Sequence, residues 1–491
     1  MAKDSSDILS KINFPPGPAW PKYAQMYFAS GCDFLRLAKR LVDKYGDVVH
    51  IQINRQHHFY INRPDLIEKI LLAGDKIWTS RPQPMRRALG QGLITSQGNL
   101  HGLMRKYMQP YFHRQSINGK VGVIDEQVEH QIGHWQDGET RDIFKDMTRF
   151  ALGTINQVVF GVPIKDDVTL QKIEHAAHII HHYGHQSLAS YINLHLEELP
   201  LVGKWTANAR ALRFMNQLFD QQIFDRRKQG NFDGDDLLSV LLKLQQTPEG
   251  AKYLTDKQIR DELMTIFFAG HETTASCMSW TFYLLSQHPH VEKKLHEELN
   301  QVLNGRIPTS EDVLNLKYTR MVICESMRLY PPVWTLGRRP VRDAGPFTVG
   351  EYDIPSRSMV LISPYLIHHD ERYYSDPEHF DPDRFLPEAE AKRSPSVYFP
   401  FGNGNRKCIG ESLAWLEIIL ALSIIASRWR LRHAPGHRIA MEPLISLKPK
   451  YGMLMKLERR ALSSTPSFST GSNEEPLSCP VSHLCPPSTS H

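Results

Sequence analysis

The feature that most constrains this chain is one cysteine held in a tight loop directly before an apolar helix. Residues 399–414 read FPFGNGNRKCIGESLA, so two glycines and two asparagines precede Cys408, and Gly410 follows it. Backbone N–H groups at a helix start, together with the helix dipole, favour a negative charge there. Arg406 and Lys407 stand beside the cysteine, and such surroundings lower a thiol pKa and favour the metal-binding thiolate. The loop therefore predicts a thiolate metal ligand or, more simply, a buried cysteine behind a flexible Gly/Asn segment.

The spacing of five residue types separates these alternatives. The pattern Phe401-x-x-Gly404-x-Arg406-x-Cys408-x-Gly410 resembles the haem-binding signature of the cytochromes P450 at every constrained position. The resemblance implies that Cys408 is the axial ligand of the iron in haem b (iron protoporphyrin IX), that Phe401 packs near the sulfur, and that Arg406 reaches a haem propionate. Thiolate ligation favours O–O cleavage. The resemblance also implies the family's mainly α fold, one large helical domain with a small β-rich region.

A second motif, Ala269-Gly-His-Glu-Thr-Thr274, lies in a helical stretch predicted over about 256–286. Glycine inside a helix costs about 1 kcal/mol relative to alanine, and threonines there can bond back to the preceding turn. The motif indicates a helix locally opened for a ligand, or a merely irregular core helix. It looks like the family's oxygen-binding helix, which implies that Thr273 and Glu272 relay protons to bound dioxygen. Ala269 and Gly270 would then leave room over the haem face.

Two charged residues three positions apart lie on one predicted helix face, Glu325 and Arg328. In isolation such a pair is an ordinary surface salt bridge. Because a double-proline stop follows, the pair resembles the family's Glu-x-x-Arg motif, which an arginine from a later Pro-rich stretch joins. Arg384 has the matching place. The resemblance implies a structural lock behind the cysteine loop, without a catalytic role.

Three further side chains resemble the residues that hold haem propionates in many soluble members of the family. They are His101 and Arg105, which follow Gly98, and Arg338. A lone histidine is more often a core or surface residue, so this alternative stays open for His101. The run of histidines at 175, 178, 181, 182 and 185 has helical spacing, and we interpret it as a polar helix face rather than a metal site, because no cysteine or carboxylate joins it at metal-site spacing.

The resemblance implies a reaction in which one atom of dioxygen enters a hydrophobic substrate, such as a fatty acid, a terpenoid or another lipophilic natural product. The expected pocket residues are apolar or nearly so: Leu93, Ile94, Phe268, Ala269, Val333, Trp334 and Leu336. The chain shows no Rossmann fingerprint or flavin module, so electrons from NAD(P)H are expected through separate partners, a ferredoxin or flavodoxin with its reductase.

Two other functions remain open at this point. A haem-thiolate isomerase or peroxygenase would need no electron donor, but members with that chemistry often lose the Thr273 and Glu272 pair. A haem-bearing sensor without turnover is the second alternative, and the lack of a fused output domain argues against it.

Composition limits the setting. Hydrophobic residues are 41% and charged residues 23% of the 491 positions, an ordinary globular balance, and the net charge is only +5. Lysines and arginines are spread along the chain, which argues against a nucleic-acid partner. Six cysteines make no disulfide framework, and no apolar run approaches the ~18–20 residues of a membrane span. We expect a soluble, cytoplasmic monomer without a membrane anchor.

The chain is expected to divide into three parts. Residues 1–14 read as a flexible leader, and 15–460 as the single haem-thiolate domain. Residues 461–491 hold nine Ser, three Thr and five Pro among 31 positions, so we expect a disordered tail.

Overall fold

The two long helices predicted around the sequence motifs are both present in the computed structural model. Helix α15 spans Asp256–Gln287, where the motif predicted about 256–286, and α20 spans Glu411–Arg428 directly after the cysteine loop. The structure describes residues 13–53, 56–74, 78–80, 86–164, 166–183, 206–341, 347–356 and 358–460. All of the predicted tail, residues 461–491, and most of the predicted leader, residues 1–14, lie outside these ranges.

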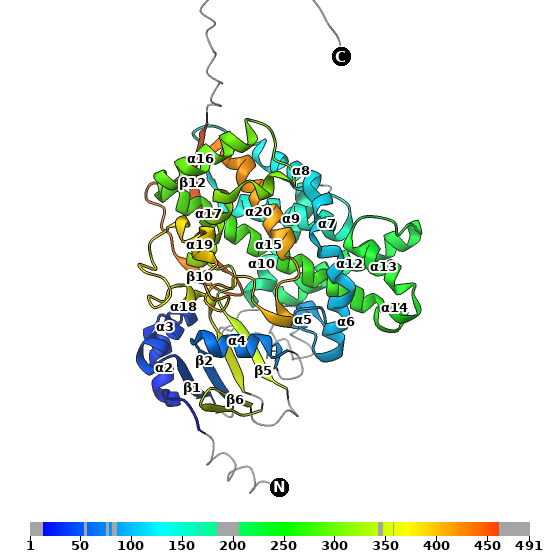
Figure 1. Ribbon diagram of the computed structural model, residues 1–491. Coiled ribbons are helices and arrows are strands. Elements are labelled where there is room, and N and C mark those ends of the chain that lie inside the picture. Colours follow the sequence, from blue (N-terminus) through cyan, green and yellow to red (C-terminus); the bar gives the residue numbers. More distant parts are fainter. Residues whose placement is uncertain are drawn as a thin grey trace, which may run out of the picture. The chain divides into compact units, whose positions relative to one another are not determined.

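Helices build most of the described chain and gather around α15 (Figure 1). Helix α15 begins at Thr255, whose hydroxyl accepts from the backbone N–H of Gln258, and it packs along α9. The other main helices are α6 (Gly98–Met108), α8 (Val121–Ile132), α9 (Ile143–Phe160), α10 (Asp167–Tyr183), α12 (Ala207–Gln229), α13 (Leu237–Gln245), α16 (Pro289–Leu303) and α17 (Lys317–Leu329). The largest buried apolar cluster draws on all of these helices and on α20.

An antiparallel hairpin lies near the N-terminus. Strand β1 (Val48–Ile53) pairs antiparallel with β2 (Gln56–Ile61), and Val48 lies opposite Ile61. Strands β8 (Met359–Ile362), β5 (Leu336–Pro340) and β3 (Trp78–Ser80) complete the sheet in the order β1-β2-β8-β5-β3. Helices α2 (Trp20–Ala29), α3 (Phe34–Tyr45) and α4 (Pro64–Leu72) lie beside this sheet in Figure 1. The predicted small β-rich region is therefore built from both the start and the later part of the chain.

Short strands close the rest of the domain. Strand β10 (Met441–Pro443) pairs with β11 (Leu447–Pro449), and β12 (Leu454–Arg459) joins β4 (Thr140–Asp142) to β9 (Trp429–His433). The β10–β11 hairpin contacts α15, which places it at the wall of the site described below. Among the described residues, no helix has both the length and the apolar character needed to cross a membrane.

The expected local opening of α15 is absent. The helix stays α-helical through 269–274, and the Thr273 hydroxyl donates back to the Ala269 carbonyl at 2.8 Å. Gly270 has a packing role, because a Cβ at this position would lie 2.7 Å from Ile155 Cδ1 of α9. The small residues thus allow two helices to approach closely, and they do so without breaking the helix.

Candidate functional site

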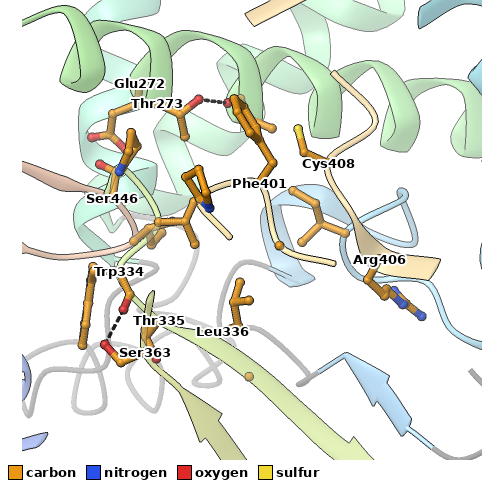
Figure 2. Close-up of a pocket in the computed structure, with 18 of the residues that line it drawn as sticks. Glu272, Thr273, Trp334, Thr335, Leu336, Ser363, Phe401, Arg406, Cys408 and Ser446 are labelled. Atoms are coloured by element: carbon orange, nitrogen blue, oxygen red, sulfur yellow. Dashed lines mark hydrogen bonds between the residues drawn. The ribbon is translucent and has the colours of Figure 1, made fainter. Parts of the chain in front are cut away.

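A cavity of about 840 Å³ lies between α15 and the cysteine loop. Figure 2 shows Glu272 and Thr273 on one side, with Cys408 and Arg406 on the other. Every residue proposed from the sequence for catalysis, haem contact or substrate contact borders this cavity: Leu93, Ile94, His101, Arg105, Phe268, Ala269, Glu272, Thr273, Val333, Trp334, Leu336, Arg338, Phe401, Arg406 and Cys408. Residues far apart in the sequence therefore meet in one place.

The cysteine loop is held by its own backbone. The Cys408 N–H donates to the Phe401 carbonyl at 2.9 Å, and the Lys407 N–H donates to the Gly404 carbonyl at 2.9 Å. Gly404 adopts φ +68°, and a Cβ there would lie 1.9 Å from the Leu71 carbonyl oxygen of α4. Only glycine fits such a position. The loop can therefore be this tight against α4, and it presents the Cys408 side chain to the cavity.

The Cys408 side chain is accessible from the cavity. Desolvation of the sulfur raises its pKa to about 11, although the Gly410 N–H, Arg105 and Lys407 lower it. The prediction that the loop alone favours the thiolate is therefore wrong, because desolvation outweighs the helix start and the nearby cations. A metal cation bound at the cavity would favour the thiolate.

Arginines gather at the cysteine end of the cavity. Arg105 donates to the Lys407 carbonyl at 2.7 Å, and Arg406 donates to the Ser96 carbonyl at 2.9 Å. Arg338 on β5 donates to the Gly337 carbonyl at 3.1 Å, and the His101 ring is buried on α6. These four side chains form a cationic and hydrogen-bonding group around one end of an otherwise largely apolar space.

The proposed lock is fully buried. Arg328 donates twice to the Glu325 carboxylate, at 2.7 and 2.8 Å, and neither side chain has exposed surface. Arg384 lies 3.4 Å from the same carboxylate. Arg328 also donates to the carbonyl of His368, whose Nε2 accepts from the Phe399 N–H at 3.3 Å. This chain of contacts links the lock to the start of the cysteine loop, and sequence reasoning missed His368.

The opposite wall differs from what the motif alone predicted. Glu272 lies 2.8 Å from Nδ1 of His181 on α10 and 3.8 Å from Nζ of Lys448 on β11. Burial alone would raise the pKa of Glu272, but His181, Lys448 and His271 hold it well below its usual value. Glu272 is therefore a carboxylate at the cavity wall with basic partners on two other elements.

The histidine run divides in the structure. His175, His178 and His182 lie on the exposed side of α10, as a polar face predicts, whereas His181 is buried against α15. Its ring stacks on His271 at 5.3 Å. Interpreting the whole run as a polar face was thus wrong for His181, because helical periodicity cannot tell which turn a neighbouring helix covers. His185 falls outside the described residues. Among the residues that the structure does describe, no group has the arrangement of a metal site.

Several polar cavity residues carried no sequence signal. Ser363 donates to the Trp334 carbonyl at 2.7 Å, and Thr274 donates to Glu417 of α20 at 3.2 Å. Burial raises the pKa of Glu417 to about 8. Further cavity residues outside the motifs include Trp20, Tyr23, Tyr27, Phe34, Thr265, Thr335 and Ser446. Their positions depend on contacts between distant segments, which a single sequence does not reveal.

The residues around the cavity fit a haem. The Cys408 thiol lies at its wall, apolar side chains cover most of its surface, and the arginines at the cysteine end suit two carboxylates. Cys408 would hold the iron, and Arg105, Arg338, Arg406 and His101 would hold the propionates.

Comparisons with known proteins agree with this geometry. The family model described as cytochrome P450 matches residues 15–456. The chain is 35% identical to the cyclooctat-9-en-7-ol 5-monooxygenase of Streptomyces melanosporofaciens, over 80% of this chain and 84% of that protein. It is 30% identical to the pentalenene oxygenase of Streptomyces avermitilis, over 80% and 85% of the two chains.

A solved structure shares the fold. The crystal structure of the cytochrome P450DA heme domain superposes with a TM-score of 0.78 and 25% identity, covering 92% of this chain and 99% of that one. The predicted fold, one mainly helical domain with a small β-rich region, is confirmed. The chain belongs to the cytochrome P450 family and is a monooxygenase of that family.

Proposed function

We propose that this monooxygenase oxygenates a neutral, compact terpenoid and receives its electrons from separate redox proteins. The observation that carries the proposal is that Cys408 and Thr273 lie on opposite walls of one cavity, whose lining is mainly apolar. Two relatives are named for oxygenating cyclooctat-9-en-7-ol and pentalenene, which supports this substrate class.

A neutral substrate is favoured over a fatty acid by the charges around the cavity. The arginines that border it lie at the cysteine end, where they would hold propionates. On the opposite wall, the two basic side chains His181 and Lys448 both already lie against the Glu272 carboxylate. A substrate carboxylate would therefore have to compete with Glu272 for them, and burying an unpaired charge is costly.

The cofactor supplies dioxygen activation when bound, and the chain supplies position and proton control. The Thr273 hydroxyl donates its one hydrogen bond to the Ala269 carbonyl. Its oxygen therefore still has two lone pairs that can accept a hydrogen bond from an O–H group in the cavity. We assign it this acceptor role. Glu272 holds its charge through His181 and Lys448, so a proton passing to it would come through the His181 ring rather than directly from solvent.

The electron donor is expected to be a ferredoxin or flavodoxin with its reductase, reduced by NAD(P)H. Lys407 is exposed next to Cys408 and pairs with Glu411, and Arg105 lies beside it. Small acidic carriers would meet a basic surface here, and complementary charge speeds such encounters.

The test is a titration of the purified haem protein with pentalenene, cyclooctat-9-en-7-ol and a saturated fatty acid, followed by the haem spin state. We expect the two neutral compounds to shift the spin state at low concentration, with little shift from the fatty acid. Turnover with donor proteins and dioxygen should then give a mono-oxygenated product. Preference for the fatty acid would overturn the substrate class, and turnover with peroxide alone would favour the peroxygenase alternative.

A further inference from the structure

The segment 90–96 carries two pocket residues into the cavity wall. It reads GQGLITS and connects α5 (Arg86–Leu89) with α6. Leu93 is buried at the cavity, and Ile94 is 38% exposed. The segment is a series of turns, in which the Thr95 and Ser96 N–H groups donate to the Gly92 carbonyl at 2.9 and 2.8 Å. Its position at the cavity wall depends on the contacts that hold it.

Glu262 of α15 holds the middle of this segment. Its Oε2 accepts from the Leu93 N–H at 2.8 Å, and its Oε1 accepts from Nε2 of Gln258 at 2.7 Å. The side chain is completely buried. Nε2 of Gln258 also donates to the Gln91 carbonyl at 3.1 Å, so both residues of α15 bind the backbone of the same segment.

Close packing makes this attachment rigid. Oδ2 of Asp261 accepts from the Gln91 N–H at 2.9 Å. A Cβ at Gly92 would lie 2.0 Å from Oγ1 of Thr265, and Gly90 adopts φ +54° against Asp261. The segment therefore lies directly on the surface of α15, with room only for glycine at two of its seven positions.

The other end of the segment reaches the cysteine loop. The Ser96 carbonyl accepts from Nη1 of Arg406 at 2.9 Å. The segment thus spans the two walls of the cavity, and Leu93 and Ile94 lie between its two attachment points. A displacement at Glu262 would move these side chains relative to both walls.

We propose that Glu262 is a positioning residue for specificity: through the Leu93 N–H it fixes how far Leu93 and Ile94 enter the cavity, and so which part of a substrate faces Cys408. This inference rests on the proposed oxygenation of a substrate in this cavity. It does not depend on the substrate being a terpenoid.

A titratable group at this place adds a second readout. Burial raises the pKa of Glu262 to about 8, against the lowering effect of the Gln258 and Leu93 donors. The charged groups near it are Asp261, the next residue on α15, and Lys257, which pairs with Asp261. Ionisation of Glu262 just above neutral pH would change how strongly it accepts from the Leu93 N–H, and it would place a second charge next to Asp261. Both effects would shift the position of Leu93.

The test compares Glu262→Ala and Glu262→Gln with the parent haem protein. Ligand affinities are measured with imidazole, which is small, and 4-phenylimidazole, whose ring extends into the cavity. Because the buried Leu93 N–H loses its acceptor, the Leu93 amide of Glu262→Ala should exchange about tenfold faster, and 4-phenylimidazole should bind about tenfold more weakly. Imidazole affinity and the thiolate spectrum should stay unchanged. Glu262→Gln should restore most of the 4-phenylimidazole affinity, because its amide oxygen can accept from Leu93.

Glu298→Ala is the matched control. Glu298 on α16 accepts from the N–H groups of Tyr318 and Thr319 at 2.6 and 2.8 Å and does not border the cavity. Its loss should lower stability without changing the ratio of the two affinities.

The pH dependence covers the case in which Glu262→Ala does not fold. Between pH 7 and 9 the parent should change its 4-phenylimidazole affinity, and Glu262→Gln should not. Equal pH dependence in both proteins, or a faster Leu93 exchange without any change in the affinity ratio, would overturn the inference. Neither readout needs a substrate that is turned over. A failed terpenoid titration would therefore count against the proposed substrate class and not against the role of Glu262.

Discussion

The two walls of the cavity are built in different ways. The centre of the Cys408 wall is one continuous stretch, in which the loop closes on itself through the Phe401 carbonyl and Gly404 meets α4. The opposite wall joins α10, α15 and β11, and its central contact is between Glu272 and His181, which are 91 positions apart. Local sequence determines the first wall, and long-range packing determines the second.

The anionic groups of the two walls are also stabilised in different ways. At the Cys408 wall, desolvation raises the thiol pKa to about 11, and a bound metal cation would favour the thiolate. At the opposite wall, His181 and Lys448 lower the pKa of Glu272. Side chains of the protein itself therefore stabilise the charge of Glu272.

The largest effect is expected at the Cys408 wall. Cys408→Ala should abolish the red-shifted Soret band of the reduced carbon-monoxide complex, because this thiolate would be the axial ligand. Cys277→Ala is the control, since Cys277 borders the same cavity from α15. A surviving band in Cys408→Ala would show that another residue holds the iron.

A substitution in the buried ion pair behind the cysteine loop should give the next largest effect. Glu325→Ala strands Arg328 in a fully buried setting, and breaking one side of such a pair costs roughly 3–5 kcal/mol. We expect little folded holoprotein, measured as haem per protein and as yield. Glu351→Ala breaks a surface pair with Arg63, and such pairs contribute only about 0–1 kcal/mol. Equal losses of folded holoprotein in the two variants would show that the buried pair stabilises the protein no more than the surface pair does.

At the opposite wall, Thr273→Ala should divert electrons without preventing binding. The variant should keep the substrate-induced spin shift and still consume NAD(P)H, but product per NAD(P)H should fall and hydrogen peroxide should rise to match. The reason is the loss of the hydroxyl oxygen that accepts a hydrogen bond in the cavity.

A control on the same helix separates this role from helix stability. Ser279 makes the same bond to the preceding turn, to the Ala275 carbonyl at 2.7 Å, and does not border the cavity. Ser279→Ala should leave coupling intact. Thr274 is unsuitable, because it borders the cavity and donates to Glu417. Unchanged coupling in Thr273→Ala would remove Thr273 from proton control.

The difference between the walls also explains what the sequence could predict. The cysteine loop and the two long helices follow from local patterns, and both helices are found where they were predicted. The partners of Glu272 could not be found, because nothing near residue 272 indicates that α10 and β11 pack there. The thiol pKa was misjudged for a related reason: its decisive cause is burial, which belongs to the whole fold.

The smallest expected effect tests whether His181 stabilises the charge of Glu272. His181→Phe keeps an aromatic ring beside His271 and removes the closest partner of Glu272. Because the folded-state pKa of Glu272 lies below its unfolded value, the pair contributes stability above about pH 4.5, and this stability is lost as the pH falls through the folded pKa. Without His181, burial raises the pKa of Glu272. We expect a loss of about 1–3 kcal/mol near pH 7.

The sign of the pH dependence makes this prediction specific. The gap in melting temperature between His181→Phe and the parent should be widest near neutral pH and should narrow as the pH falls toward 4.5, because protonation relieves the unpaired carboxylate in the variant. His182→Phe is the control, since His182 is exposed on the same helix. It should leave the melting temperature unchanged at every pH. A gap that stays constant with pH would mean that His181 acts through packing alone, and Glu272 would then depend on Lys448 for its charge.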